Sequence, residues 1–207
     1  MKHIAESTVR RLSLYLRFLE ELEGQGRETI SSEVLADSGG TTSAQVRKDL
    51  SFFGSFGKRG LGYSVTALAK RLREILGLGQ PWQVVIIGAG KIGAALAQYR
   101  GFRARGFHVV GIFDSDPAKV GRTLDGVTVS DLAQLERELK QLKPQIAVLT
   151  VPADVAQELV QRLTKAGVRG ILNFAPATLH APDGVTVRSV NMALELEILS
   201  YALAHER

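Results

Sequence analysis

The spacing of apolar residues over the first forty positions predicts two helices. Between residues 8 and 23 apolar side chains recur at intervals of three and four, the spacing of one helix face, with charged residues between them. The glycines within 24–26 end this helix. A shorter helix follows, which Ser31 or Ser32 caps, and it ends at the glycine pair 39–40.

A third helix is predicted to begin after Thr42. Thr42 and Gln45 have capping-box spacing, so each side chain can satisfy a free backbone N–H of the other residue. Val46, Leu50 and Phe53 recur at helical spacing and form the buried face. The polar residues on the other faces are Ser43, Gln45, Arg47, Lys48 and Ser51.

Aromatic residues and glycines alternate through 52–65 around a Lys-Arg-Gly sequence. This pattern predicts a two-stranded hairpin whose tip projects Lys58 and Arg59, with Gly60 allowing the backbone to approach a phosphate closely. A fourth helix and a glycine-containing linker follow. Helices joined by a glycine turn, followed by a hairpin, are the layout of a winged helix-turn-helix domain, predicted here over 1–80. The third helix and the hairpin tip are the expected DNA contacts.

From Trp82 onward, short apolar runs alternate with helical stretches, which is typical of βαβ units. The run 83–87 is apolar on both faces, as a central strand of a parallel sheet should be. The other predicted strands are 108–113, 146–151, 170–174 and 185–187. We therefore expect an α/β fold in which a Rossmann-like parallel-sheet domain occupies 81–190.

Composition and charge narrow the function. Of the 207 residues, 45% are hydrophobic and 23% are charged, and the absence of cysteine excludes disulfides and thiolate chemistry. No apolar run approaches the ~18 residues of a membrane span, and no signal peptide is recognisable. Residues 42–73 hold seven Lys or Arg against Asp49 alone, a net charge of +6. This concentration predicts a polyanion partner, although a solvated surface would give the same count.

A glycine-rich loop, Gly88-Ala89-Gly90-Lys91-Ile92-Gly93, lies between the run 83–87 and a helix. In that context it is a dinucleotide-binding fingerprint: Gly88 permits the tight turn, Gly90 lets a pyrophosphate approach, and Gly93 lets helix and strand pack closely. The helix N-terminus offers free N–H groups to the phosphates. The alternative is a turn with a structural role only.

Asp114 ends the second strand, 21 residues after Gly93. A carboxylate there can accept from both ribose hydroxyls and would repel a 2′-phosphate, which favours NAD(H) over NADP(H). Lys119 and Arg122 follow closely enough in sequence to offset that repulsion.

The nicotinamide ring is neutral in NADH and cationic in NAD⁺, and an apolar pocket penalises the cation by desolvation. The residues that we expect at the ring are Val151, Pro152 and Phe174 near strand ends, Tyr99 as a cover and Met192 from the C-terminal segment.

Side chains suited to catalysis are scarce. His3 and His205 lie at the termini, and His108 and His180 have no acidic partner that the sequence reveals. Only 126 residues follow Pro81, and a dinucleotide-binding domain uses nearly all of them. We therefore expect no catalytic residue, no metal site and no enzymatic activity. The alternative is a small NAD-dependent oxidoreductase with an oligomerising helical N-terminal domain.

The segment 191–207 is predicted to be a helix that is apolar nearly all round. Two apolar stripes run along it, made of Met192, Leu196, Leu199 and Leu203, and of Leu194, Ile198 and Tyr201. Such a helix needs more than one surface to bury it. It is either a last Rossmann helix packed on its own sheet or an arm held by a partner subunit.

Four strings of sequence resemble the Rex family of redox-sensing transcriptional repressors: 43–54, 57–63, 149–153 and 170–176. The resemblance implies a cytoplasmic homodimer with exchanged C-terminal helices. It further implies that the dimer binds palindromic operator DNA and releases it when NADH binds, without a membrane or metal partner.

That family's terminal helix commonly opens with an Asp, able to pair with an Arg in the first helix of the other subunit. Asn191 stands at this position, and Arg17 is present in the first helix. A neutral amide binds Arg less strongly than a carboxylate, so weaker coupling is expected.

Overall fold

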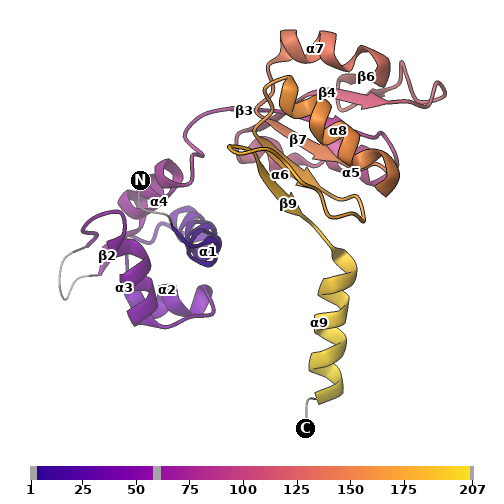
Figure 1. Cartoon of the computed structure of the whole chain (residues 1–207). Coiled ribbons are helices and arrows are strands. Elements are labelled where there is room, and N and C mark those ends of the chain that lie inside the picture. The colour runs from indigo at the N-terminus through magenta and orange to yellow at the C-terminus, as the bar shows by residue number, and fades with distance from the viewer. Residues whose placement is uncertain (1–3, 58–61, 206–207) are drawn as a thin grey trace. The chain divides into compact units, whose positions relative to one another are not determined.

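The structure is a computed structural model that describes residues 4–57 and 62–205 (Figure 1). The chain divides into two compact units, Met1–Gln80 and Pro81–Arg207. Helices dominate the first unit, whereas the second contains a seven-stranded sheet with helices between the strands. The α/β fold class predicted from the sequence is confirmed.

Helices and two very short strands build the first unit. Hydroxyl oxygens of Ser31, Thr42 and Ser64 accept backbone N–H groups and begin the second, third and fourth helices. Of the two predicted candidates for the second helix, Ser31 is therefore the cap. The elements are α1 (Glu6–Gly24), β1 (Thr29–Ile30), α2 (Ser32–Ser38), α3 (Ser43–Ser51), β2 (Tyr63–Ser64) and α4 (Val65–Ile75).

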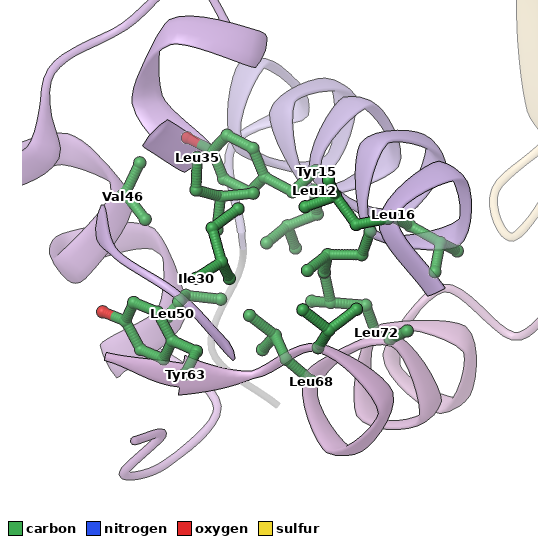
Figure 2. Packing of buried hydrophobic residues seen from close by; sticks show 14 of the residues in the cluster. Leu12, Tyr15, Leu16, Ile30, Leu35, Val46, Leu50, Tyr63, Leu68 and Leu72 are labelled. Carbon is green, nitrogen blue, oxygen red and sulfur yellow. The ribbon is translucent and has the colours of Figure 1, made fainter. Parts of the chain in front are cut away.

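Apolar side chains from all four helices of this unit meet in one core (Figure 2). Leu16 of α1, Leu50 of α3 and Leu72 of α4 are buried there together. The ring of Tyr15 also lies in this core, at the turn that joins α2 to α3. A side chain on Gly39 would collide with that ring, so the glycine that ends α2 is required by close packing.

The predicted wing hairpin differs from the structure. Strand β2 pairs antiparallel with β1, which precedes α2, and residues 52–57 form no strand. Phe53 and Phe56 pack against the helical core instead. Gly54 and Gly57 have φ angles of 122° and 81°, which a regular strand does not contain. The predicted tip residues Lys58, Arg59 and Gly60 lie outside the described residues.

The sheet of the second unit has the order β5-β6-β4-β3-β7-β8-β9, and every neighbouring pair except β5 and β6 is parallel. Without the short β5, this is the 3-2-1-4-5-6 order of doubly wound dinucleotide-binding folds. The strands are β3 (Trp82–Ile87), β4 (Phe107–Asp114), β5 (Thr123–Leu124), β6 (Val127–Asp131), β7 (Ile146–Leu149), β8 (Gly170–Asn173) and β9 (Thr186–Ser189). The helices are α5 (Lys91–Ala97), α6 (Arg100–Ala104), the 3-10 turn Leu132–Gln134, α7 (Leu135–Leu142), α8 (Ala153–Lys165) and α9 (Met192–His205).

The central strand β3 is buried on both faces, as its sequence predicts. Val85 and Ile87 pack with residues of α7 and α8 on one face. Val84 and Ile86 pack on the opposite face with Ala97 of α5. Because the strand order reverses between β3 and β7, the carboxyl ends of these two strands open a crevice of the kind in which such sheets bind ligands.

The C-terminal helix α9 contains no buried residue. Leu196 and Leu203 are 67% and 72% exposed, so the alternative in which this helix packs on its own sheet is wrong. The side-chain oxygen of Asn191 accepts the backbone N–H groups of Ala193 and Leu194 and caps the helix. A 14-residue apolar helix is thus fully formed but leaves its apolar surface exposed.

Candidate nucleotide site and DNA-binding helix

The glycine-rich loop leaves β3 in the conformation that the motif predicts. Gly88 has a φ of 99°, and a side chain there would meet the backbone carbonyl of Thr150. A side chain on Gly93 would collide with the carbonyl oxygen of Gly88. Gly90 differs, because a Cβ there would have no atom within 4 Å. The first and last glycines therefore allow close packing, and Gly90 leaves open space where a phosphate can approach the backbone.

Thr150, which was not predicted as a site residue, holds this loop from the end of β7. Its hydroxyl lies 2.7 Å from the carbonyl oxygen of Gly88 and 3.1 Å from that of Ile87. Its backbone N–H also donates to the carbonyl of Ile87. The turn at Gly88 is thus fixed from the neighbouring strand as well as by its own backbone.

Asp114, at the end of β4, is buried and bonded on several sides. Its carboxylate accepts the backbone N–H groups of Ala89 at 2.6 Å and Asp116 at 2.8 Å, and Nζ of Lys119 lies 3.2 Å from Oδ2. Burial acts to raise the pKa of Asp114, but these backbone N–H donors and the Lys119 ammonium outweigh it and lower the pKa. Asp114 is therefore ionised at neutral pH and anchors the glycine-rich loop through Ala89.

A cavity of about 500 Å³, within the range of small-molecule sites, opens beside the loop. Its wall combines the polar groups of Asp114 and Lys119 with the apolar surfaces of Leu132 and Val155. The polar groups can bind the hydroxyls of a sugar, and the apolar surfaces can pack against a flat base. The predicted cofactor residues on its wall are Gly88, Gly90, Asp114, Val151 and Pro152.

A second cavity, of about 620 Å³, lies beside β8, β9 and the root of α9. Ile92, Phe174 and Met192 are among its apolar lining residues. Of the residues expected near the nicotinamide ring, Val151 and Pro152 line the first cavity, whereas Phe174 lines the second. The glycine-rich loop supplies Gly90 to one cavity and Ile92 to the other, so a ligand that crosses the loop can enter both.

Asn173, at the end of β8, supports the wall of the second cavity and was not predicted. Its side chain is fully buried. Oδ1 accepts the N–H of Ala175 at 2.9 Å, and Nδ2 lies 3.1 Å from the carbonyl oxygens of Ala175 and Ala177 and 3.3 Å from Oγ of Ser189. All three partners line the cavity, so a single amide determines the position of this wall.

Four predicted cofactor residues line neither cavity: Ala89, Lys91, Gly93 and Tyr99. Tyr99 is 55% exposed, and its ring packs edge-on against Phe102 with the ring centroids 5.2 Å apart. Lys91 begins α5, and its side chain is exposed.

Helix α3 presents Arg47 and Lys48 to solvent. Nη1 of Arg47 donates to Oγ of Ser32 at 2.9 Å and lies 4.0 Å from the carboxylate of Glu33, while the side chain stays 55% exposed. Residues of α2 therefore orient a cation that solvent and ligands can still reach. The polar residues of this exposed or half-buried surface are Ser43, Arg47, Lys48 and Ser51.

Gln45 does not complete the predicted capping box. Oγ1 of Thr42 accepts the backbone N–H of Gln45 at 3.2 Å, as expected. The side-chain amide of Gln45, however, donates to Oδ1 of Asp49 at 2.8 Å. A buried carboxylate one turn later is a charged acceptor, and it draws the amide away from the helix start.

Asp49 is a buried charge that the apolar pattern of α3 does not reveal. Its side chain has no exposed surface, and Arg11 of α1 donates to both carboxylate oxygens at 2.6 and 2.7 Å. The hydroxyl of Tyr15 donates at 3.1 Å. Burial acts to raise the pKa of Asp49, but the bonds from Arg11 and Gln45 outweigh it and lower the pKa. Burial and the Asp49 charge together raise the pKa of Tyr15 to about 12.

Part of the basic excess predicted for the first unit is neutralised within it. Arg73 of α4 lies 3.1 Å from both Glu20 and Glu23 of α1. Arg71 lies 2.8 Å from Glu74 of the same helix. The sequence count therefore overstates the charge available to a polyanion.

Across residues 4–57 and 62–205, no group of three or more His, Asp or Glu side chains is placed to hold a metal ion. In the same ranges, no helix is both long enough and apolar enough to cross a membrane.

Two family models match the chain in separate regions. Residues 79–177 match the model described as "CoA binding domain". Residues 3–51 match the model described as "Putative DNA-binding protein N-terminus". The matches fall on the sheet of the second unit and on the helices α1 to α3.

Similarity to known proteins extends over nearly the whole chain. It is 47% identical over 203 residues to the redox-sensing transcriptional repressor Rex of Carboxydothermus hydrogenoformans, covering 98% of each. Identity to Rex of Streptomyces coelicolor is 46% over 198 residues, covering 96% of this chain and 77% of that one. The crystal structure of RSP with NAD⁺ and operator DNA is similar at a TM-score of 0.93 and 39% identity, covering 98% of this chain and 94% of that one. RSP with NADH gives a TM-score of 0.90 at 37% identity, with 98% and 95% covered. The chain therefore belongs to the Rex family of redox-sensing transcriptional repressors.

Proposed function

We propose that this protein is a DNA-binding transcriptional repressor that senses the cytoplasmic NADH/NAD⁺ ratio. It binds palindromic operators and releases them when NADH binds. The observation that carries the proposal is that one chain joins a glycine-rich nucleotide site to a helix-turn-helix unit, and that 98% of it resembles a repressor crystallised with both NAD⁺ and operator DNA.

NAD(H) spans both cavities in this proposal. The adenosine half occupies the first cavity, where Asp114 and Lys119 meet the ribose hydroxyls, and the pyrophosphate crosses the loop at Gly90. The nicotinamide enters the second cavity beside Ile92 and Phe174. An apolar wall admits the neutral ring of NADH at a lower desolvation cost than the cationic ring of NAD⁺, which favours NADH.

The recognition surface is the exposed side of α3 together with the wing. Arg47 and Lys48 are its principal cations, and they divide between base edges and phosphates. A base-reading Arg or Lys contributes about 1–3 kcal/mol, whereas a phosphate contact changes the salt slope of binding by about one unit. The other proposed contacts are Ser43, Ser51, Lys58, Arg59 and Gly60.

A homodimer with exchanged C-terminal helices explains the exposed apolar surface of α9. Met192 lines the second cavity at the root of this helix, so cofactor and dimer arm meet at one residue. Binding of NADH at this point changes the separation of the two winged helices, and operator half-sites have a fixed spacing. A nearly complete switch needs about 5.5 kcal/mol of differential affinity, which two NADH molecules per dimer share.

The protein regulates and does not turn over substrate in this proposal. Hydride transfer to a carbonyl requires a proton donor beside the substrate, usually a His. No His lies among the residues that line the two cavities.

The test uses a DNA duplex that the native protein selects from a random pool. Binding is measured by fluorescence anisotropy at constant total NAD(H) and varied NADH/NAD⁺ ratio. Release that follows the ratio is the expected result, and release that follows total cofactor would overturn redox sensing. Oxidation of common alcohols or hydroxy acids at ordinary enzyme rates would instead indicate an oxidoreductase.

A further inference from the structure

We propose that Asp49, held by Arg11 and Tyr15, determines the orientation of the DNA-reading helix α3. Gln45 belongs to this cluster as a positioning residue and does not contact a base. The inference rests on the proposed role of α3 in reading DNA and assigns that role a buried support.

Apolar packing alone gives weak control over the rotation of α3 about its own axis. Besides Asp49, only Val46 and Leu50 of this helix are buried among the described residues. Apolar burial has no directional preference, so two side chains one turn apart leave rotation about the helix axis poorly determined. Hydrogen bonds to a carboxylate are directional, and a two-pronged contact with a guanidinium is more so.

The carboxylate of Asp49 uses both oxygens fully. Oδ2 accepts from Nε of Arg11 at 2.6 Å and from the hydroxyl of Tyr15 at 3.1 Å. Oδ1 accepts from Nη2 of Arg11 at 2.7 Å and from Nε2 of Gln45 at 2.8 Å, with the Thr8 hydroxyl at 3.4 Å. Three of these residues belong to α1, so the cluster fixes the orientation of α3 relative to α1. A buried ion pair is often no more stabilising than apolar residues of similar volume, so the contribution that we infer for this one is the orientation of α3.

Gln45 commits one of its two amide N–H groups to the cluster, and this bond holds its side chain toward Asp49. A Gln recognises adenine by donating from its amide nitrogen and accepting with its amide oxygen together. Here the amide nitrogen donates to Asp49. Because the bond to Asp49 fixes the direction of this side chain, the inference assigns Gln45 an effect on DNA binding through the position of α3, which sets where Arg47 and Lys48 meet the groove.

The first experiment compares the selected duplex with a random-sequence duplex of equal length, using the full-length protein. Asp49→Asn keeps the side-chain shape and removes the charge, and we expect about tenfold weaker binding to the selected duplex. Binding to the random duplex should change by less than about twofold, because phosphate contacts dominate it. Tyr15→Phe should shift the ratio in the same direction by less. Glu23→Gln is the matched control, since it removes an ion pair of 3.1 Å between α1 and α4, and the ratio should not change.

The second experiment measures Gln45→Ala on every single-base variant of the selected duplex. An equal loss on all of them is expected, and a loss confined to one base pair would show that Gln45 reads that base. Undiminished affinity of folded Asp49→Asn for the selected duplex would overturn the inference. If Asp49→Asn fails to fold, Tyr15→Phe decides in the same way. A native protein that selects no sequence would overturn the proposed function instead.

Discussion

Replacing Asn173 with alanine should separate the two halves of the proposed cofactor site. The Asn173 amide contacts residues of the second cavity wall and none that line the first. The change should therefore weaken binding of NADH and leave binding of ADP, which lacks the nicotinamide half, nearly unaltered.

The size of the effect follows from the partners that lose their bonds. Without the amide, the buried N–H of Ala175 has no protein partner, whereas its carbonyl oxygen still accepts the backbone N–H of Ala177 at 2.8 Å. An unsatisfied buried group costs about 1–3 kcal/mol, so the native wall becomes less stable by roughly that amount. The wall will relax to regain bonds with water. If relaxation recovers half of the cost, roughly 0.5–1.5 kcal/mol opposes nicotinamide binding, which is about a twofold to tenfold loss in NADH affinity.

Calorimetric titration of NADH and ADP into the native protein and Asn173→Ala measures this difference, with thermal unfolding to show that the variant is folded. Thr150→Val is the matched control on the other side of the loop. It removes the hydroxyl that lies 2.7 Å from the Gly88 carbonyl, so it should weaken both ligands. Equal losses of ADP and NADH in Asn173→Ala, or no loss in a folded variant, would refute the reasoning.

The other predictions concern cofactor preference, dimer formation and acid stability. Asp114→Ala should weaken NADH binding and narrow its advantage over NADPH in parallel titrations, and equal affinity of the native protein for both would contradict the role of Asp114. Leu196→Glu places a charge on exposed apolar surface of α9, and sedimentation velocity should show dissociation, while Glu197→Gln on the same helix should remain dimeric. The pKa of Asp49 is lowered in the folded state, so its ionised form stabilises the fold above the unfolded value of about 3.9, and this contribution is lost as the pH falls. Urea unfolding should therefore show a difference in the free energy of unfolding between native protein and Asp49→Asn that is largest near neutral pH and disappears toward pH ~2. A difference independent of pH would exclude that carboxylate as its source.

Features with a local cause were predictable from the sequence. The strand 83–87 is apolar on both faces because both faces are covered, and the glycines of the loop occupy positions where a Cβ would collide or block an open space. Thr42 caps α3 as its spacing to Gln45 predicts. Each of these features depends on residues a few positions apart, so the local sequence is enough to predict it.

Features that depend on distant segments were missed. Strand β6 was not predicted, although its residues alternate apolar and polar as a strand does, because a run of five residues is a weak signal until it pairs with β4 and β5. Likewise, β2 was expected to pair within a hairpin, but its partner β1 lies some thirty residues earlier. Asn173 is the last residue of β8 and Thr150 follows β7, and polar residues are common at such strand ends. Their roles arise from loops that meet them only in the folded sheet.

Charge shows why counting residues cannot replace structure at the DNA-binding surface. The count assigned every cation of 42–73 to a polyanion footprint and treated Asp49 as a small deduction. In the structure Arg73 binds two carboxylates of α1, whereas Asp49 is buried and takes its charge partner, Arg11, from outside the counted stretch. The acidic residue therefore does not weaken the field at the exposed face of α3, because Arg11 neutralises it. Asp49 contributes to DNA binding by fixing the geometry of the helix. Its removal should therefore reduce the preference for the selected duplex and should not increase the affinity for DNA in general.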